Sequence, residues 1–337
     1  MTASGAIEGG GSDGQGRIGI AARFDVGAAP HARTFYRALA LTRNVSGGAP
    51  GARLVFADDD GTTDGGRRAA RHLLDAGVDV VVGHMTSDAA LAAAALYDKS
   101  GTPLLLPTAT ATALTEAHPR VLRLCPSDRL LAERLVRHAA ASGATRIQLG
   151  CEATKHGEQL ADDIAEAARA IGLAVNRAGA GEAPETPDNG AHHVFAGAVD
   201  TAAAHVRALR HAGYAGQIHL TDDAASPVLA ARIGEDAGVS IIGFAPAHRR
   251  PEATTFARLY QQHYGGLPGV NAVETSQALQ IAASLSRQPC RDADHLRSGR
   301  FATSFGTIGF QQGQSLNTAH CIWSIQADGL VAGNPLI

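Results

Sequence analysis

The sequence predicts an α/β protein of two doubly wound domains, each with a mostly parallel sheet covered by helices on both faces. Three observations predict this fold class. The chain of 337 residues is too long for one core of ordinary size. Hydrophobic residues make up 45% of it but aromatic residues only 4%, which favours tightly stacked layers of Ala, Val, Leu and Ile. Short apolar runs alternate with amphipathic stretches, and this βα alternation occurs twice along the chain.

The strand-like runs are mostly continuous in hydrophobicity, which is typical of parallel strands buried on both faces. The expected strands are Arg17–Ala22, Arg53–Ala57, Val78–Gly83, Pro103–Pro107 and Val121–Leu124, followed by Arg146–Gly150, Leu173–Ala178, His193–Ala198, Gln217–Thr221 and Val239–Phe244. The expected helices between them include Thr63–Ala76, Asp128–Ala141, Gly157–Ile171 and Thr201–Ala212. Glycines follow these helices at positions 77, 143, 172 and 213, where a helix should end.

The end of the chain departs from this rhythm. Two consecutive helices, Ala253–Tyr264 and Asn271–Arg287, have no strand between them. A glycine-rich stretch, Phe305–Gly313, and a last apolar strand, Cys321–Gln326, follow. Two appended helices must pack against an existing domain, and Ile242–Pro246 is the segment that would carry the chain back to the first one. Each domain would then be assembled from separate parts of the chain.

Composition and charge argue against several classes of protein. The formal net charge is −3 and no basic stripe occurs, so a nucleic-acid partner is not expected. No apolar run approaches the ~18 to 20 residues of a membrane-spanning helix, so the protein is not expected to be embedded in a membrane. Residues 1–17 are small, polar and glycine-rich, which predicts disorder. They contain no basic segment followed by an apolar stretch, as a signal peptide would.

No pattern of cysteines or histidines points to a metal, and no other cofactor is expected. The four cysteines, Cys125, Cys151, Cys290 and Cys321, form no CxxC pair and have no metal-ligand spacing with a histidine. They are expected to be buried small side chains, and a Cys290–Cys321 disulfide stays open as an alternative if the protein is exported. The short motifs of hydrolases, P-loop enzymes, zinc proteases and dinucleotide-binding enzymes are missing, so the sequence gives no support to an enzyme.

Polar residues follow two neighbouring strands of the first half. His84-Met85-Thr86-Ser87 come after Val78–Gly83 and precede a strong helix, for which Thr86 or Ser87 is a suitable N-cap. Thr108-Ala109-Thr110 come after Pro103–Pro107 and also precede a helix start. Ligands of open α/β sheets bind beyond the carboxyl ends of strands, and the first turn of a helix offers free N–H groups. An anion site and a pair of ordinary caps both fit this pattern.

Carboxylates follow two other strands. Asp222-Asp223 come after Gln217–Thr221, where they suit an ammonium group or a metal, or else form a polar loop before a helix. Asp58-Asp59-Asp60 follow an earlier strand and are expected to form a solvated loop.

With these residues in view, the chain resembles the branched-chain amino-acid (Leu/Ile/Val)-binding proteins of ABC transporters, which have the type I periplasmic binding protein fold. The specific block runs from Val78 to Glu116 and contains Gly83-His84, Ser87, Tyr97 and the turn Pro107-Thr108-Ala109-Thr110. Order and spacing extend the resemblance from Ile18 over nearly the whole chain. It implies two Rossmann-like lobes joined by three hinge crossovers, near residues 125–128, 245–248 and 316–320. The lobes would be 18–126 plus 247–317 and 127–246 plus 318–337.

The resemblance also implies a ligand site between the lobes. Ser87, Thr108 and Thr110, with Ala109 in the same turn, match positions that hold a ligand α-carboxylate; Asp223 matches an acid that holds the α-ammonium group; His156 matches a tyrosine that lines the pocket. The side-chain pocket departs from the family. The loop Arg23–His31 is shorter and lacks the tyrosine that covers the ligand, and Val199 replaces another tyrosine. An amino-acid-like or amide-like ligand is therefore expected, rather than leucine in particular.

The implied function is a non-enzymatic solute-binding protein that delivers its ligand to an ABC permease after export. Its location would be periplasmic if a signal peptide precedes the given start, and cytoplasmic if the given start is real. The alternative is a cytoplasmic amide or amino-acid sensor on the same fold. An in-frame basic and apolar segment in the DNA upstream of Met1 would favour export.

Overall fold

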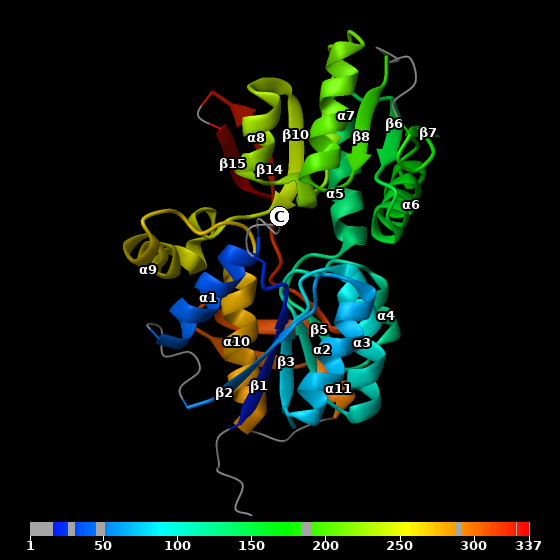
Figure 1. Cartoon of the computed structure of the whole chain (residues 1–337). Helices are drawn as coiled ribbons and strands as arrows, with labels where there is room; N and C mark the ends of the chain where they lie inside the picture. The colour runs from blue at the N-terminus through cyan, green and yellow to red at the C-terminus, as the bar shows by residue number, and fades with distance from the viewer. Residues whose placement is uncertain are drawn as a thin grey trace, which may run out of the picture.

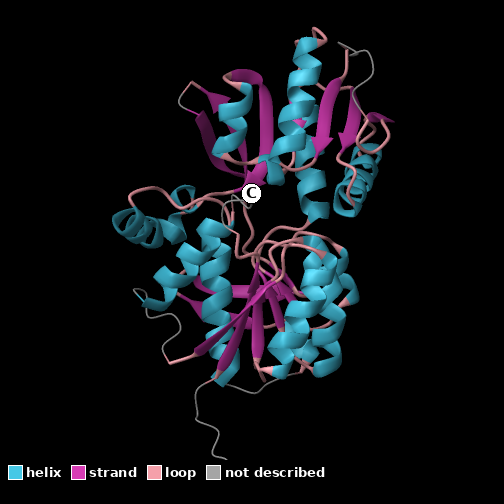
Figure 2. Cartoon of the chain, in the orientation of Figure 1, coloured by secondary structure: helices cyan, strands magenta, loops and turns pink. Residues whose placement is uncertain are grey.

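The computed structural model describes residues 16–25, 31–44, 51–182, 190–287, 292–327 and 329–336. The segment 1–17, expected to be disordered, lies outside them except for its last two residues, and Arg17 begins the first strand. One sheet of eight strands and one of seven lie in separate lobes (Figure 1). Helices cover both faces of each sheet (Figure 2). The predicted fold class is confirmed.

The first lobe is built around the eight-stranded sheet, in the order β11-β12-β13-β5-β4-β3-β1-β2. The early part of the chain supplies β1 (Arg17–Ala22), α1 (Ala32–Asn44), β2 (Arg53–Asp58), α2 (Thr63–Asp75), β3 (Val80–Gly83), α3 (Ser87–Ser100), β4 (Leu104–Leu106), α4 (Ala113–Ala117) and β5 (Val121–Arg123). A later part supplies α9 (Thr254–Tyr264), α10 (Ala272–Arg287), α11 (Ala293–Arg297), β11 (Arg300–Thr303), β12 (Gly306–Gln311) and β13 (Gln314–Ser315). Strands β1 to β5 are mutually parallel.

The second lobe repeats this plan around the seven-stranded sheet, in the order β15-β14-β10-β9-β8-β6-β7. Its elements are α5 (Asp128–Ala141), β6 (Arg146–Cys151), α6 (Lys155–Ala170), β7 (Ala174–Arg177), β8 (His192–Ala196), α7 (Val199–His211), β9 (Ile218–Leu220), α8 (Pro227–Ile233), β10 (Asp236–Phe244), β14 (His320–Gln326) and β15 (Gly329–Leu336). Strands β6 to β10 are parallel, and β14 and β15 are antiparallel additions. Both lobes therefore share one doubly wound strand order.

Small residues explain how so few aromatic side chains suffice for these cores. Helices α2 and α3 pack side by side over one face of the first sheet, and the alanines of α3 that face inward are fully buried. A Cβ atom on Gly66 of α2 would lie only 2.3 Å from the carbonyl oxygen of Ala89. The two helix backbones thus approach more closely than larger side chains would allow.

The chain passes between the lobes three times. It crosses between β5 and α5, again after β10, and finally between β13 and β14. These connections lie at the positions expected for the three hinges, and they converge on the middle of the molecule (Figure 1).

The C-terminal region contains more strand than the sequence predicts. The glycine-rich stretch Phe305–Gly313 includes β12 and the turn to β13, and Gly313 takes a φ of 78° there. Strand β15 was not expected at all. Strands β12 and β15 are antiparallel to their neighbours and partly exposed, so they lack the continuous apolar run of the buried strands. His193, the first residue of an expected strand, is the second residue of β8 and is 2% exposed.

Cys125, Cys151 and Cys321 are buried thiols, as predicted. Cys290, the proposed partner of Cys321 in the alternative disulfide, lies outside the described residues. Among the helices that the structure describes, none is both long enough and apolar enough to cross a bilayer.

His219 of β9 is the centre of a buried histidine cluster in the second lobe. Its Nε2 lies 2.9 Å from Nδ1 of His192, and its Nδ1 lies 2.7 Å from Oγ of Ser240. The ring of His138 packs edge-on against it. Burial, together with the charges of His138 and His192, lowers the pKa of His219 to about 3.

We expect His219 to make folding depend on pH. Its pKa in the folded protein lies below the unfolded value of 6.5, so its stabilising contribution is present above pH 6.5 and is lost as the pH falls towards 3. His219→Asn should therefore destabilise the protein more at pH 7 than at pH 5, by about 2 kcal/mol. Urea unfolding at both pH values measures this difference, with the exposed His211→Asn as the control. Equal destabilisation by His219→Asn at both pH values would contradict a buried neutral imidazole.

Candidate functional site

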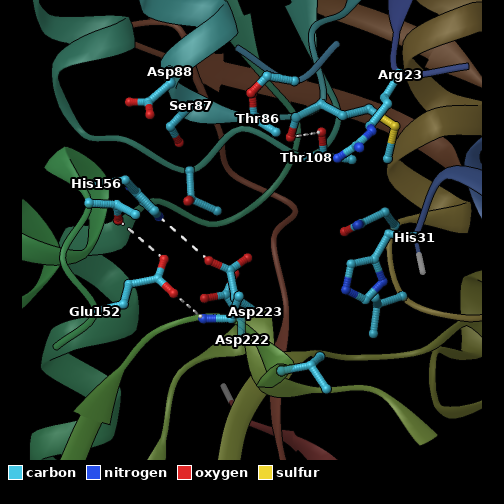
Figure 3. Close-up of a pocket in the computed structure, with 18 of the residues that line it drawn as sticks. Arg23, His31, Thr86, Ser87, Asp88, Thr108, Glu152, His156, Asp222 and Asp223 are labelled. Carbon is cyan, nitrogen blue, oxygen red and sulfur yellow. Dashed lines mark hydrogen bonds and ion pairs between the residues drawn. The ribbon is translucent and has the colours of Figure 1, made fainter. Parts of the chain in front are cut away.

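A cleft of about 830 Å³ lies between the lobes, at the carboxyl ends of the parallel strands of both sheets (Figure 3). Its lining includes Arg23 after β1, Ser87 after β3, Glu152 after β6 and Ala198 after β8. Strands β1 and β3 are neighbours in the first sheet, and β6 and β8 are neighbours in the second. The connections that follow the two strands of each pair lead in opposite directions along the sheet. Such a switch point is where open α/β sheets bind ligands.

Hydroxyl groups and a helix start form the first-lobe wall of the cleft. Thr86 is the N-cap of α3: its hydroxyl accepts a hydrogen bond from the backbone N–H of Ala89 at 3.3 Å and donates to the carbonyl of Gly61 at 3.0 Å. Ser87 is the first residue of the helix, and its Oγ accepts from the N–H of Ala111 at 3.2 Å. The capping role therefore belongs to Thr86. Since Ser87 acts as an acceptor towards Ala111, its hydroxyl hydrogen is available for another acceptor.

Thr108 fastens the loop after β4 to the loop after β3. Its hydroxyl donates to the carbonyl of Met85 at 2.8 Å. Since a hydroxyl has a single hydrogen, this bond leaves Thr108 without a donor for a ligand carboxylate.

A chain of buried polar groups supports this wall from below. The imidazole of His84 lies 2.8 Å from the carboxylate of Asp59 and 3.2 Å from the hydroxyl of Tyr97. Asp59 also accepts from the N–H of Gly61 at 2.9 Å. The prediction of a solvated loop is wrong for Asp59, which is fully buried, whereas Asp58 and Asp60 are exposed. A buried carboxylate is stable here because His84 and the Gly61 N–H both satisfy it.

Arg123, at the end of β5, fixes the turn that carries Thr110. The side chain is only 2% exposed. Its guanidinium donates to the carbonyls of Thr110 and Ala111, at 3.0 and 2.5 Å, and to the hydroxyl of Thr115 at 3.1 Å. Its Nε donates to Oε1 of Gln314 in β13 at 2.7 Å. Because every bond has a defined direction, the turn has little freedom to move.

Acidic side chains dominate the opposite wall. Nε2 of His156 lies 3.8 Å from the carboxylate of Asp223, and Nδ1 lies 3.5 Å from that of Asp128. The carboxylate of Glu152 accepts from the N–H of Ala198 at 3.0 Å and from two threonine hydroxyls. Asp222 and Asp223 occupy a short 3-10 turn after β9, and Figure 3 shows both near His156 and Glu152.

Burial and mutual repulsion shift the titration of this wall. Burial raises the pKa of Asp128, although His156 opposes the shift. Burial, then the charges of Asp223 and Asp128, raise the pKa of Asp222 well above its usual range. Burial alone would lower the pKa of His156, but Asp128 and Asp223 outweigh it and raise that pKa. The carboxylates around the imidazole therefore favour its protonated form.

Five of the six residues predicted to bind ligand line the cleft: Ser87, Thr108, Thr110, His156 and Asp223. The sixth, Ala109, is buried in the core of the first lobe and is not among the lining residues. The sequence did not single out Arg23 or Glu152 as ligand residues, whereas Asp222 belongs to the Asp222-Asp223 pair that it considered for an ammonium group or a metal. The signal common to Arg23 and Glu152 is position, because each comes directly after a parallel strand at a switch point.

The site contains no obvious metal centre. Within the described ranges, no group of three or more histidine, cysteine, aspartate or glutamate side chains is arranged to hold a metal ion.

The sequence matches the periplasmic binding protein family over residues 43–330, which is most of the chain. This match confirms the resemblance drawn from the sequence. A search of curated proteins finds no significant match.

Solved structures with the same fold cover nearly all of the chain. A leucine-binding protein from Thermotoga maritima superposes with a TM-score of 0.83 at 17% identity, covering 95% of this chain and 98% of its own. An ABC transporter substrate-binding protein from Desulfitobacterium hafniense, in complex with leucine, gives 0.76 at 21% identity, covering 95% and 100%. An ABC transporter solute-binding protein from Rhodopseudomonas palustris, in complex with 3,4-dihydroxybenzoic acid, gives 0.77 at 18% identity, covering 96% and 97%.

Thr86 and Ser87 should separate helix capping from ligand binding. Thr86→Ala removes the N-cap of α3 and is expected to lower the free energy of unfolding by about 1 kcal/mol. Urea unfolding measures that loss. Ser87→Ala leaves the cap in place but removes the acceptor of the Ala111 N–H, so it should cost stability for a different reason. Amide hydrogen exchange separates the two variants: the Ala89 N–H should lose protection in Thr86→Ala and keep it in Ser87→Ala. Unchanged protection of Ala89 in Thr86→Ala would contradict the assignment of the cap to Thr86.

Proposed function

Because the chain belongs to the periplasmic binding protein family, we propose that it captures a dipolar, amino-acid-like solute between its lobes and delivers it to an ABC permease without catalysing a reaction. One observation carries this proposal: the cleft joins a wall that offers the Ser87 hydroxyl and the N–H groups at the start of α3 to a wall of carboxylates. A ligand with a carboxylate at one end and a cation at the other would complement both walls.

The donor wall suits the carboxylate of the solute. Ser87 has a hydroxyl hydrogen to donate, and the first turn of α3 adds free N–H groups and the positive end of the helix dipole. Thr110 lines the same region. Leucine and 3,4-dihydroxybenzoic acid, the ligands of two similar structures, both contain a carboxylate.

The acidic wall suits the cationic end of the solute. Asp223 is the most accessible carboxylate of the pair at the end of β9, with a side chain that is 43% exposed. His156 lies beside it and orients it. A ligand that contacts both walls would stabilise a closed arrangement of the lobes through the contacts that exist only in that arrangement. The three crossing connections provide the hinge for this motion.

We place this activity on the outer side of the cytoplasmic membrane, as the family suggests. A permease partner would then recognise the closed, loaded form in preference to the open one. Such coupling needs no enzymatic step, because closure is driven by the differential affinity of the two forms for the solute.

Asp223→Ala tests the acidic wall directly. Native mass spectrometry of the purified protein would first identify a co-purified small molecule, and calorimetry would measure its affinity. Loss of one charged contact should weaken binding by about ten- to a hundredfold while the fold survives. Asp64→Ala is the control. It removes an exposed carboxylate on α2, far from Asp223 in the sequence, and should leave the affinity unchanged. An unchanged affinity of Asp223→Ala would remove this residue from the site.

Lobe closure is the second expected outcome. Small-angle X-ray scattering should show a smaller radius of gyration when the co-purified solute is added to the emptied protein. Asp223→Ala at the same solute concentration should keep the larger radius, because less of it is bound. A radius that does not respond to saturating solute would contradict capture by closure.

A further inference from the structure

The acidic wall contains more carboxyl groups than cationic partners. Asp128 and Asp223 lie 3.5 and 3.8 Å from the two ring nitrogens of a single imidazole, that of His156, and Asp222 stands in the same short turn as Asp223. One imidazolium cannot pair with all three, and burial together with the neighbouring carboxylates raises the pKa of Asp128 and of Asp222.

Two of these carboxylates also lack hydrogen bonds in the interior. Asp128 is fully buried at the start of α5, and among the described residues neither of its oxygens meets a hydrogen-bond donor in good geometry, although the nearby Thr110 hydroxyl favours its charged form. Asp222 lines the cleft, yet its Oδ1 is buried and has no hydrogen-bond partner in the part of the chain that the structure describes. Buried, unsatisfied acceptors of this kind are costly, so each calls for a partner such as a water, an ion, a proton or a ligand.

The other charged groups of the cleft do not supply the missing positive charge. Arg232 forms an ion pair with Asp200. Arg23 lies beside Gly61 and Thr86 on the first-lobe wall, and Figure 3 shows it apart from the acidic residues. His31 faces Asp223, but burial lowers its pKa, so it is mainly neutral at neutral pH. The carboxylate of Glu152 needs no further donor, because a backbone N–H and hydroxyl groups already satisfy it.

We propose that the solute carries a net positive charge in the form of a guanidinium or amidinium group, which binds between Asp222 and Asp223. This inference rests on the proposed function and narrows it to a class of ligand. A zwitterion with a neutral side chain would leave the charge of the cleft unchanged, whereas a net cation reduces it. A planar cation with several N–H donors can also reach carboxylates that face it from different directions, which a single ammonium group does less well.

The test compares L-arginine with L-citrulline by calorimetry at neutral pH. Citrulline has the same length and shape, but an uncharged urea group replaces the guanidinium. Arginine should bind about ten- to a hundredfold more tightly than citrulline. L-leucine serves as a neutral branched-chain probe, and agmatine, which lacks the carboxylate, should bind more weakly than arginine.

Matched variants locate the preference. Asp222→Asn keeps the shape of the side chain and should bring the affinities for arginine and citrulline close together. Asp64→Asn removes an exposed carboxylate that does not line the cleft, so it should keep the preference for arginine. Thermal unfolding of both variants verifies that they fold. A preference for arginine that survives in Asp222→Asn would overturn the assignment to Asp222.

The outcomes separate this inference from the proposed function. If citrulline or leucine binds as tightly as arginine, or binds when arginine does not, the cationic class is wrong and capture of a solute stands. If none of the four probes binds, the guanidinium class is also wrong, and capture of a solute is then decided by the co-purified molecule and by lobe closure.

Discussion

The buried guanidinium of Arg123 is the interaction on which the geometry of the cleft depends. It binds the carbonyls of Thr110 and Ala111 on the ligand side, and Gln314 on the other. Gln314 in turn donates to the carbonyl of Cys125, in the first connection between the lobes, at 2.9 Å. An arginine can be buried only if its donors are satisfied, and here carbonyls, an amide and a hydroxyl do so in place of an acid. One side chain thus ties the donor wall to two of the three connections between the lobes.

The two walls of the cleft differ in how completely their polar groups are satisfied. On the first-lobe side, the hydroxyl groups of Thr86 and Thr108 donate their hydrogens to carbonyls within the protein. That wall is therefore rigid before any ligand arrives, which reduces the entropy lost on binding. On the second-lobe side, Asp128 and Asp222 retain unsatisfied oxygens. Selectivity should come chiefly from this second wall, because buried polar groups without partners discriminate between ligands that satisfy them and ligands that do not.

The sequence predicted the regular core well, because strands buried on both faces leave uninterrupted apolar runs. The bounds of β1 and α5 agree with the expected ones, and the order of βα units is right. Edge strands such as β15 escaped prediction, since one face meets water and the apolar signal is broken. The site was predictable only in part. Nothing local distinguishes Asp59 from its exposed neighbours, because its partner His84 is distant in sequence. Likewise Asp128 looks like an ordinary first-turn acid until the crossing brings it against His156.

The division of both lobes between distant parts of the chain has a consequence for synthesis on the ribosome. When the first 250 residues have emerged, β5 and β10 are both still bare edges, since β13 and β14 come later. Neither lobe can complete its sheet at that stage. The nascent polypeptide therefore exposes two unpaired strand edges until about ninety further residues have been synthesised. A chaperone that shields those edges would prevent aggregation during that interval. Termination of synthesis within the final quarter of the chain would yield a product prone to aggregate.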